Sequence, residues 1–401
     1  MGKLAERLRS LVRSLICKGS RGVYYDKVPS PPRKQMLSHQ WLSACRPFAR
    51  NGAKLLSVDP PYKVEFPEQT PFSPHPTLCE HRWPRNVVDV PGTYVLEIPY
   101  GRTIGARGTV LTNDNVLISD LSMQEDLTAA EHFLIKKPQE TPSKLRRLKG
   151  TYALLSCFGT TTYHWIYDCL PRFEVLRRAG YDREAFDGFL IRRPKYQPHY
   201  KALELLGIPE DKIVWCTKSS HYGCDRLVVP SFTTDHLVDD QKDHHPWVFP
   251  FLQNLAGISL ESAGKKRRIL LNRKDSLSTA RQFSNQAEFA ALLEKYGFEE
   301  VTLGEFDFLG QARLFASAEF IVAAHGGGLS NLCFCAPSTK VLELFAPDYV
   351  RVHFRNIARQ LGLRYEPLVM ECVSNSREPM FGGNIRVDLL QAEEIVRTML
   401  I

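Results

Sequence analysis

The residues best suited to chemistry lie in the stretch HGGGLSN, which spans residues 325–331 and follows an apolar run typical of a buried strand. Three consecutive glycines, Gly326, Gly327 and Gly328, indicate a turn that has to accept positive φ angles or the close approach of another group. The N–H groups of such a turn, and of a helix that starts there, can bind an anion. We therefore expect a diphosphate at this turn, although a tight strand-to-helix turn without a ligand would use the same glycines.

Polar residues beside the turn favour the ligand-binding alternative. His325 precedes the glycines at the carboxyl end of the expected strand, Asn331 follows them, and Glu343 lies in the next strand at the same end of the sheet. A histidine there can donate a hydrogen bond to a phosphate or a sugar hydroxyl, and a carboxylate is suited to a ribose diol. A solvated or ion-paired Glu343 is the alternative. The spacing matches neither the dinucleotide fingerprint nor the P-loop.

A second segment supplies cations. Asn272 and Arg273 end the run RRILLNR, and Arg281 and Asn285 follow in the next loop and helix start. A guanidinium group offers paired donors that match phosphate oxygens. Single arginines are usually surface residues, and it is the position at the carboxyl end of an expected strand that favours a binding role.

An acid–base pair stands in the first half of the chain, in FGTTTYHWIYDCLPR. His164 and Asp168 are four residues apart, so they share one face of the expected helix. Either group could remove a proton from an acceptor hydroxyl. The alternative is a hydrogen-bonded pair that only braces the helix.

A possible metal motif, DDQKDHH, contains His244 and His245 beside Asp239, Asp240 and Asp243. Such a sequence is more often a solvated loop, and no cysteine or histidine spacing typical of zinc sites is present. We therefore expect no metal and no other cofactor.

The apolar and amphipathic pattern predicts how these residues are positioned. Short apolar runs alternate with helical segments in two successive series, which predicts two α/β units with a ligand cleft between them. Before them, residues 55–91 are expected to form an extended strap and residues 92–122 a small antiparallel sheet. The expected domains are a basic arm with an amphipathic helix (1–54), an acceptor-side α/β domain (55–255), a donor-binding α/β domain (256–385) and a final helix (386–401).

Charge and composition limit the partners. The net charge of +8 over 401 residues is confined to residues 1–54, which hold twelve Lys or Arg and two acids, so the remaining residues are close to neutral. This excludes a long nucleic-acid channel. The leucine-rich face near the amino terminus is typical of a helix lying on an anionic membrane surface, or of one packed on its own domain. Ten scattered cysteines and the absence of a secretory signal pattern favour a cytoplasmic location.

Four motifs taken together resemble glycosyltransferase family 61. They are YHWIYDCLPR, RRILLNR with RQFSN, GQARLFASAEFIVAAHGGGLSNLCF, and KVLEL, in the order of that family. The resemblance implies a GT-B-like α/β fold of two facing Rossmann-like domains, here with a small β-rich amino-terminal subdomain. It also implies inversion at the anomeric carbon without an obligatory metal. Bacterial members that resemble this chain build capsular or other surface polysaccharides.

The same resemblance assigns roles to positions. The donor diphosphate turn would comprise His325, Gly326, Gly327, Gly328, Leu329 and Asn331, and the same pocket would include Arg273, Arg281, Asn285 and Glu343. His164 and Asp168 would face a glycan or lipid-linked glycan acceptor. Gly327 stands where the family commonly has Ala, Gln286 where Glu commonly follows the Asn, and Gly310 where Glu commonly precedes the Gln. An epimerase-like enzyme acting on nucleotide sugars, or a glycan-binding protein without activity, remains the alternative function.

Overall fold

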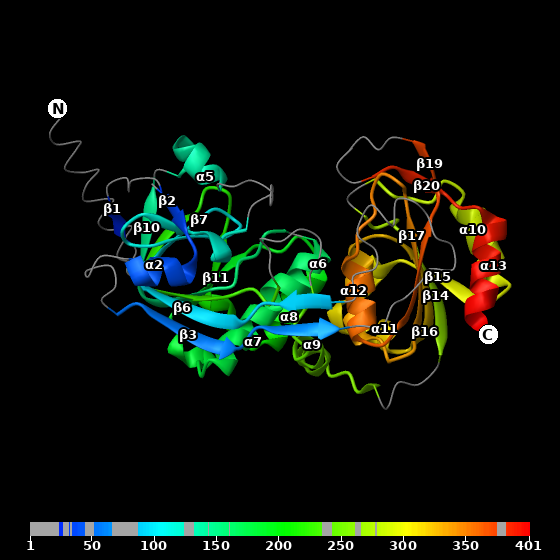
Figure 1. Cartoon of the computed structure of the whole chain (residues 1–401), viewed down its shortest axis with the longest axis horizontal. Helices are drawn as coiled ribbons and strands as arrows, with labels where there is room; N and C mark the ends of the chain where they lie inside the picture. The colour runs from blue at the N-terminus through cyan, green and yellow to red at the C-terminus, as the bar shows by residue number, and fades with distance from the viewer. Residues whose placement is uncertain are drawn as a thin grey trace.

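The protein is described by a computed structural model over residues 24–26, 32, 34–44, 52–65, 87–123, 132–142, 144–159, 161–234, 243–260, 266–276, 279–374 and 382–401. The amphipathic helix predicted near the amino terminus lies outside these residues. Within them, no helix combines the length and the apolar character needed to cross a bilayer. Two α/β units lie side by side, the first blue to green and the second yellow to red (Figure 1).

The first unit is built on a mixed eleven-stranded sheet. Its central strands β12, β11, β10 and β13 are parallel, and the antiparallel strands β6 and β7 continue the sheet from β13. The strands of the sheet are β1 (Tyr24–Asp26), β2 (Lys34–Met36), β3 (Lys54–Asp59), β6 (Thr93–Pro99), β7 (Arg102–Ile104), β8 (Thr109–Leu111), β9 (Val116–Ile118), β10 (Leu145–Leu154), β11 (Gly188–Arg192), β12 (Ile213–Cys216) and β13 (His221–Pro230).

The small antiparallel sheet predicted over residues 92–122 is present as β6 to β9, but these strands extend the large sheet instead of standing apart. The predicted strap differs more. Its described residues form β3, which pairs with β6, and a separate antiparallel pair of β4 (Tyr62–Glu65) and β5 (Val87–Val90). The alternation of apolar and polar residues in these short strands is too brief to distinguish them from extended chain.

Helices cover the face of the first sheet that is turned toward the second unit (Figure 1). Helix α6 passes through a π-helical turn into α7, so the chain between them is wound more loosely than an α-helix. The helical segments of this unit are α2 (Ser38–Ala44), α5 (Phe133–Lys136), α6 (Thr162–His164), the π turn η3 (Trp165–Cys169), α7 (Leu170–Arg178), α8 (Gln197–Leu205), α9 (Val248–Leu255), and the 3-10 turns η1 (Ser119–Leu121), η2 (Pro138–Glu140), η4 (Arg183–Ala185) and η5 (Glu210–Lys212).

The second unit is a doubly wound five-stranded parallel sheet in the order β15-β14-β16-β17-β18. Neighbouring residues of its central strand pack on opposite faces: Phe320 and Val322 join the core under α10 and α13, whereas Ile321 and Ala323 join the core shared with α11 and α12. Its strands are β14 (Arg267–Leu271), β15 (Phe298–Val301), β16 (Ala318–Ala324), β17 (Lys340–Phe345) and β18 (Arg364–Val369), with a ribbon of β19 (Glu371–Ser374) and β20 (Asn384–Arg386).

Local signals fix several helix boundaries of this unit. The Asp307 side chain accepts from the Gly310 N–H at the start of α11, and Asp388 caps α13 in the same way. Helix α13 packs with α10 on the second sheet, so the final helix is part of this unit. The helical segments are α10 (Gln286–Glu294), α11 (Phe308–Ala316), α12 (His353–Gln360), α13 (Leu389–Leu400), and the 3-10 segments η7 (Leu303–Glu305) and η8 (Gly327–Phe334). Two α/β units in tandem, facing each other through their helices, make this a GT-B-like fold.

One apolar core runs through both units. It contains buried residues of α7 and α9 from the first unit together with residues of α11, η8 and α12 from the second. Inside it, the Tyr167 hydroxyl donates to the Ser330 carbonyl over 2.8 Å. The units are therefore joined by buried contacts as well as by the chain.

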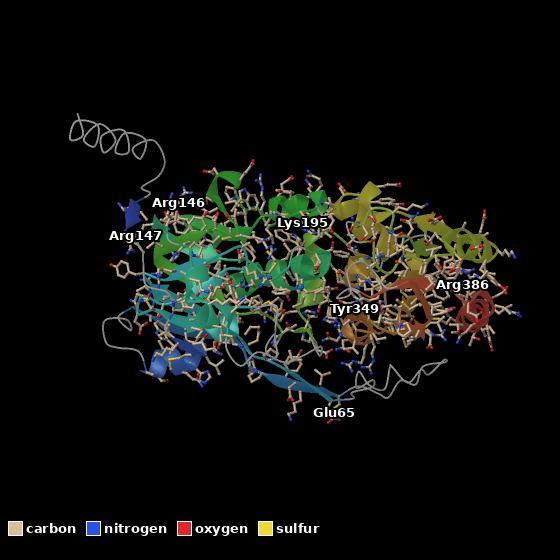
Figure 2. The ribbon with its side chains drawn as sticks, turned by 90° about the horizontal axis from the view of Figure 1, so that it is seen from above. Glu65, Arg146, Arg147, Lys195, Tyr349 and Arg386 are labelled. Atoms are coloured by element: carbon tan, nitrogen blue, oxygen red, sulfur yellow. The ribbon has the colours of Figure 1, made fainter. Side chains whose placement is uncertain are left out.

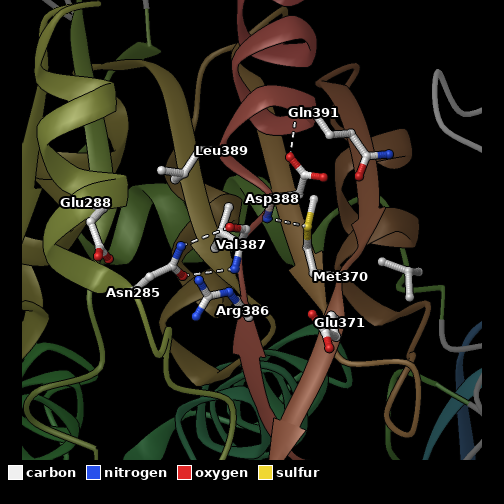
Figure 3. A pocket seen from close by; sticks show the side chains of 10 residues that line it. Asn285, Glu288, Met370, Glu371, Arg386, Val387, Asp388, Leu389 and Gln391 are labelled. Carbon is white, nitrogen blue, oxygen red and sulfur yellow. Dashed lines mark hydrogen bonds between the residues drawn. The ribbon is translucent and has the colours of Figure 1, made fainter.

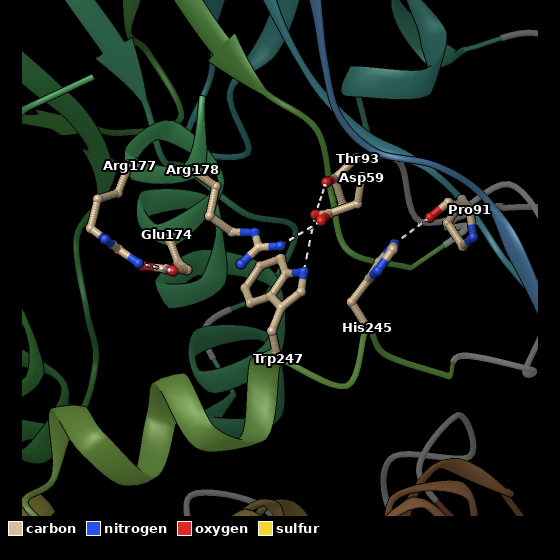
Figure 4. Close-up of polar contacts among 8 residues, drawn as sticks. All are labelled: Asp59, Pro91, Thr93, Glu174, Arg177, Arg178, His245 and Trp247. Carbon is tan, nitrogen blue, oxygen red and sulfur yellow. Dashed lines mark hydrogen bonds and ion pairs between the residues drawn. The ribbon is translucent and has the colours of Figure 1, made fainter. Parts of the chain in front are cut away.

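The connecting segment before α9 is fixed to the first unit (Figure 4). The Trp247 indole N–H donates to the Asp59 carboxylate over 3.0 Å, and the Arg178 guanidinium lies 2.6 Å from the other oxygen of that group. His245 Nε2 bonds the Pro91 carbonyl over 2.6 Å. The same segment reaches the second unit through a buried ion pair between Asp243 and Arg359 of α12, at 2.9 Å.

Candidate active site

The glycine turn joins β16 to η8 without any left-handed residue. Gly326 is extended, with φ of 170° and ψ of 170°, and neither Gly327 nor Gly328 has a positive φ. The prediction that these glycines supply positive φ is wrong. The segment that follows is a 3-10 helix in place of the predicted α-helix.

Close approach is the reason for glycine instead. A Cβ on Gly326 would come within 3.0 Å of Arg273 Nη1, and one on Gly328 would lie 2.8 Å from a methyl group of Leu303. A Cβ on Gly327 would lie 3.7 Å from Thr162, which is ordinary van der Waals contact. The turn is therefore closed on two sides by its own unit, and its middle residue faces the first turn of α6.

Arg273 is held against the turn by its surroundings. Its Nη1 donates to the His325 carbonyl over 3.3 Å, its Nε to Ala280 O over 3.2 Å, and its Nη2 to Ser276 Oγ over 3.3 Å. Burial lowers the pKa of Arg273 to about 10, helped by the positive charge of Arg281. The group therefore remains a cation at neutral pH, aimed at the glycine backbone.

Two further arginines stand beside it. Arg281 has a φ of 57°, and its guanidinium carbon lies 4.6 Å from the ring centre of Tyr349. Arg351 lies 4.7 Å from the same ring. Burial lowers the pKa of Arg281. Holding several cations so close together is unfavourable unless an anion neutralises them, and this is the arrangement expected of a phosphate-binding site.

His325 and Glu343 form a buried pair. His325 Nδ1 lies 2.5 Å from Glu343 Oε1, and the Tyr365 hydroxyl donates to the other carboxyl oxygen. Glu343 is fully buried, and this burial raises its pKa to about 8. Burial also lowers the pKa of His325 well below its ordinary value, reinforced by Arg281. The prediction that Glu343 contacts a ribose diol is wrong, because both of its oxygens are already hydrogen-bonded inside the protein.

Three other predicted donor residues do not face the site. Leu329 is buried in the core. The Asn331 amide donates to the Gly328 carbonyl and to Gln311 Oε1, both over 3.1 Å, so it braces the glycine turn. Asn285 exchanges two hydrogen bonds with the backbone of Val387, at 2.9 and 3.0 Å. The structure does not bring the Asn285 amide to the His325 pair.

The predicted acid–base pair is present on the first unit. His164 Nδ1 lies 2.5 Å from Asp168 Oδ2, the Asp168 side chain is 1% exposed, and that of His164 is 19% exposed. The π turn carries Asp168 inward, while a Cβ on Gly159 would collide with the His164 ring. The ring edge of His164 also contacts Phe158, with 5.1 Å between ring centres. The imidazole is therefore fixed in one orientation and its carboxylate partner is shielded from water.

The two halves of the site meet at η8. Thr162 at the start of α6 lies against Gly327, as described above, and Tyr163 packs edge-on against His353 of α12 with ring centres 5.1 Å apart. Tyr196, which precedes α8, is close enough to Arg273 to feel its charge. The acid–base pair of the first unit and the cationic turn of the second thus line one junction. Figure 2 shows Tyr349 on the second unit and Lys195, next to Tyr196, on the first.

Sequence reasoning missed Tyr365, Tyr349, Arg351 and His353. The first lies in the strand after Glu343 and the others in the loop and helix that follow β17. Their position at the carboxyl end of a parallel sheet was a usable signal, because ligands of such folds bind there.

The residues of DDQKDHH that the structure describes have other partners. Asp243 is paired with Arg359, His245 with the Pro91 carbonyl, and His244 stacks on Tyr167 with ring centres 4.6 Å apart. Across the described residues, no group of three His, Cys, Asp or Glu is placed to hold a metal ion. Asp239 and Asp240 lie outside them.

A separate cavity of about 480 Å³ opens between α10 and the β18 to α13 region (Figure 3). Asn285, Glu288, Met370, Glu371 and Arg386 are among the residues that line it. It contains none of the arginines or histidines of the glycine turn, so it is a different feature from the site described here.

Comparison with known proteins agrees with this geometry. The family model of Glycosyltransferase 61 matches residues 162–342, from the start of α6 into β17. The matched region contains the His164–Asp168 pair, Arg273, Arg281 and the whole glycine turn. Over these residues, the chain is similar to glycosyltransferase family 61.

Two plant proteins are similar to a short part of the chain. A beta-1,2-xylosyltransferase of Arabidopsis thaliana is 33% identical over 69 residues, which is 17% of this chain and 12% of that protein. Beta-1,2-xylosyltransferase RCN11 of Oryza sativa subsp. japonica is 38% identical over 58 residues, or 14% and 11% of the two chains. Among solved structures, E. coli ADP-heptose lps heptosyltransferase II overlaps 63% of this chain and 98% of its own, at 11% identity and a TM-score of only 0.30.

Proposed function

We propose that the protein is an inverting glycosyltransferase that moves a sugar from a nucleotide-sugar donor to a hydroxyl group of a glycan acceptor. The observation that carries the proposal is the junction at η8. There the second unit presents Arg273 and Arg281 around a glycine turn, and the first unit presents a buried carboxylate bonded to a partly exposed histidine. One half suits a leaving diphosphate and the other a proton acceptor. The match of residues 162–342 to the family 61 model agrees with that division.

The chemistry follows from these positions. The acceptor oxygen attacks the anomeric carbon from the face opposite the diphosphate, and the bond from that carbon to the diphosphate breaks with its electron pair. His164 takes the acceptor proton, because its ring is partly exposed and Asp168 stabilises the imidazolium that forms. Arg273 and the N–H groups of the turn stabilise the charge that develops on the diphosphate. These steps need no metal ion, and we include metal independence in the proposal.

Binding of nucleotides tests the donor half. Nucleoside diphosphates and nucleotide sugars should raise the melting temperature selectively for one base, and a ligand at 100 times its Kd stabilises by about 2.7 kcal/mol. Arg273→Ala should abolish this stabilisation. Arg268→Ala is the matched control, since Arg268 lies in β14, the strand that precedes Arg273, but pairs with Glu319, away from the turn. No stabilisation of the wild type by any nucleotide would contradict the proposal and favour a glycan-binding protein without activity.

Incubation with and without acceptor tests the reaction. A transferase leaves the donor sugar unchanged apart from slow hydrolysis until an acceptor is added, whereas an epimerase-like enzyme would convert the donor alone.

The broader setting is also part of the proposal: a surface or capsular polysaccharide acceptor, a cytoplasmic location, and contact of the basic amino-terminal arm with anionic membranes. Liposome flotation with and without residues 1–18 tests the last point.

A further inference from the structure

The described site contains one feature that donor binding does not explain, the buried chain of Tyr365, Glu343 and His325. Glu343 is completely buried in β17, and its two oxygens are engaged by Tyr365 on one side and by His325 Nδ1 on the other. Tyr365 satisfies the oxygen that His325 does not reach, and burial keeps water away from both, so proton exchange of this carboxyl group is directed to His325. His325 Nδ1 is the ring nitrogen that Glu343 engages, which leaves Nε2 for a ligand at the turn.

The charges around this chain decide where its proton lies. Three arginines face His325: Arg273 after β14, Arg281 in the loop before α10, and Arg351 just before α12. His353, the first residue of α12, also faces it. These positive charges disfavour a positive charge on the imidazole of His325, so the ring stays neutral.

Glu343 faces fewer charges than His325, and burial has the largest effect on its pKa. Arg281 and the Tyr365 hydroxyl favour the carboxylate, but burial outweighs both and favours the acid. Arg355 and Glu366 lie beside Tyr365 and oppose each other there. The pair therefore holds one acidic proton on its short Oε1 to Nδ1 hydrogen bond, and this bond requires the Nε2–H tautomer of His325.

We propose that Glu343 and His325 form a proton relay that protonates the leaving diphosphate. As the bond from the anomeric carbon to the diphosphate breaks, His325 Nε2 gives its proton to a diphosphate oxygen. Nδ1 takes the carboxyl proton of Glu343 at the same time, so the imidazole ends neutral in its other tautomer and Glu343 ends as a carboxylate. Tyr365 then donates to that carboxylate. Glu343 and Tyr365 act through His325 and are positioning residues; the inference rests on the proposed transferase function.

The pH dependence of turnover tests the relay. The active form has Glu343 protonated, and its folded pKa of about 8 lies above the ordinary value, so activity is present below that pH and is lost as pH rises through about 8. Glu343→Gln keeps a donor to Nδ1 but cannot transfer a proton. We expect nucleotide Kd to stay within a factor of about three, kcat to fall by about 10²-fold or more, and the alkaline limb near pH 8 to disappear.

Tyr365→Phe should keep the alkaline limb of the pH profile, which Glu343→Gln removes, but shift it. Loss of the hydroxyl removes a hydrogen bond that favours the carboxylate, so the alkaline limb should move to higher pH. The matched control is Tyr296→Phe, which removes a similar Tyr–Glu bond, 2.5 Å to Glu393, on the opposite side of the second sheet and should leave the limb in place. Turnover is measured as donor hydrolysis without acceptor, using the nucleotide sugar that stabilises the wild type, and melting curves confirm that each variant is folded.

The outcomes separate the two proposals. If the wild type is active and Glu343→Gln leaves the alkaline limb unchanged, the relay is wrong while the transferase proposal stands. If Glu343→Gln weakens nucleotide binding as much as it lowers kcat, Glu343 has only a structural role. If the wild type neither binds a nucleotide nor turns one over, the proposed function itself fails.

Discussion

Replacing Gly326 with alanine tests the central relationship of the site, the contact between the glycine turn and Arg273. The extended φ of 170° suits alanine, so the backbone itself is not strained. The new Cβ would lie 3.2 Å from Arg273 Cζ and within 3.0 Å of Nη1, and something has to move. The three hydrogen bonds of Arg273 are 3.2 to 3.3 Å long, so the guanidinium should yield before the buried strand does.

The size of the effect follows from what Arg273 does in the proposed reaction. Losing one preorganised donor to a developing anion costs about 10² to 10³ in kcat, or roughly 3 to 4 kcal/mol of transition-state stabilisation. We expect Gly326→Ala to show a loss of this order, with a small change in melting temperature. Gly327→Ala is the control, because its Cβ would make only ordinary contact with Thr162, at 3.7 Å. It should keep most of the activity.

A double-mutant cycle provides the refutation. If alanine at Gly326 acts by displacing Arg273, it should cost almost nothing more in an Arg273→Ala background. Initial rates of sugar transfer, or of donor hydrolysis, are measured for the two single variants and the double variant. Losses that multiply would show that Gly326 acts independently of Arg273, and the interpretation of the turn as a seat for this guanidinium would be wrong.

Three further outcomes follow from buried contacts. Asp168→Asn should lower transfer by about 10² to 10⁴-fold while nucleotide-induced stabilisation persists, and retention of most activity would remove the acid–base role of this pair. Tyr167→Phe removes the hydroxyl that donates to the Ser330 carbonyl, which also accepts from the Cys333 thiol, and should reduce the free energy of unfolding by about 0.5 to 1.5 kcal/mol, measured by denaturant titration. Arg359→Met leaves the Asp243 carboxylate buried without its cation and should cost about 3 to 5 kcal/mol by the same titration, whereas a loss below about 1 kcal/mol would mean that water reaches the pair.

The alternating apolar runs were sufficient to predict the parallel cores of both units. The apolar run before the glycine turn and the run that contains Glu343 form the strands β16 and β17, as the sequence indicated. These strands are buried on both faces, so their composition alone identifies them. Short antiparallel strands such as β3 and β4 were missed because they depend on partners distant in sequence.

The site was predictable in its residue types and less so in their roles. The carboxyl ends of β14 and β16 placed Arg273 and His325 together as expected. The role of Glu343 could not be foreseen, since it depends on a hydroxyl contributed by β18. The reason for glycine at position 326 could not be predicted either. A guanidinium packed against the backbone and a left-handed backbone both require glycine, and the sequence does not distinguish the two causes.

The apolar core shared by the two units indicates that they do not fold independently of each other. Helices α7 and α9 cover surface on α11 and η8 that would otherwise face water, so neither half is a self-sufficient folding module. We expect the chain to unfold in a single cooperative transition, and a chimera that joins this second unit to the first unit of a relative to require grafting of the facing helices as well.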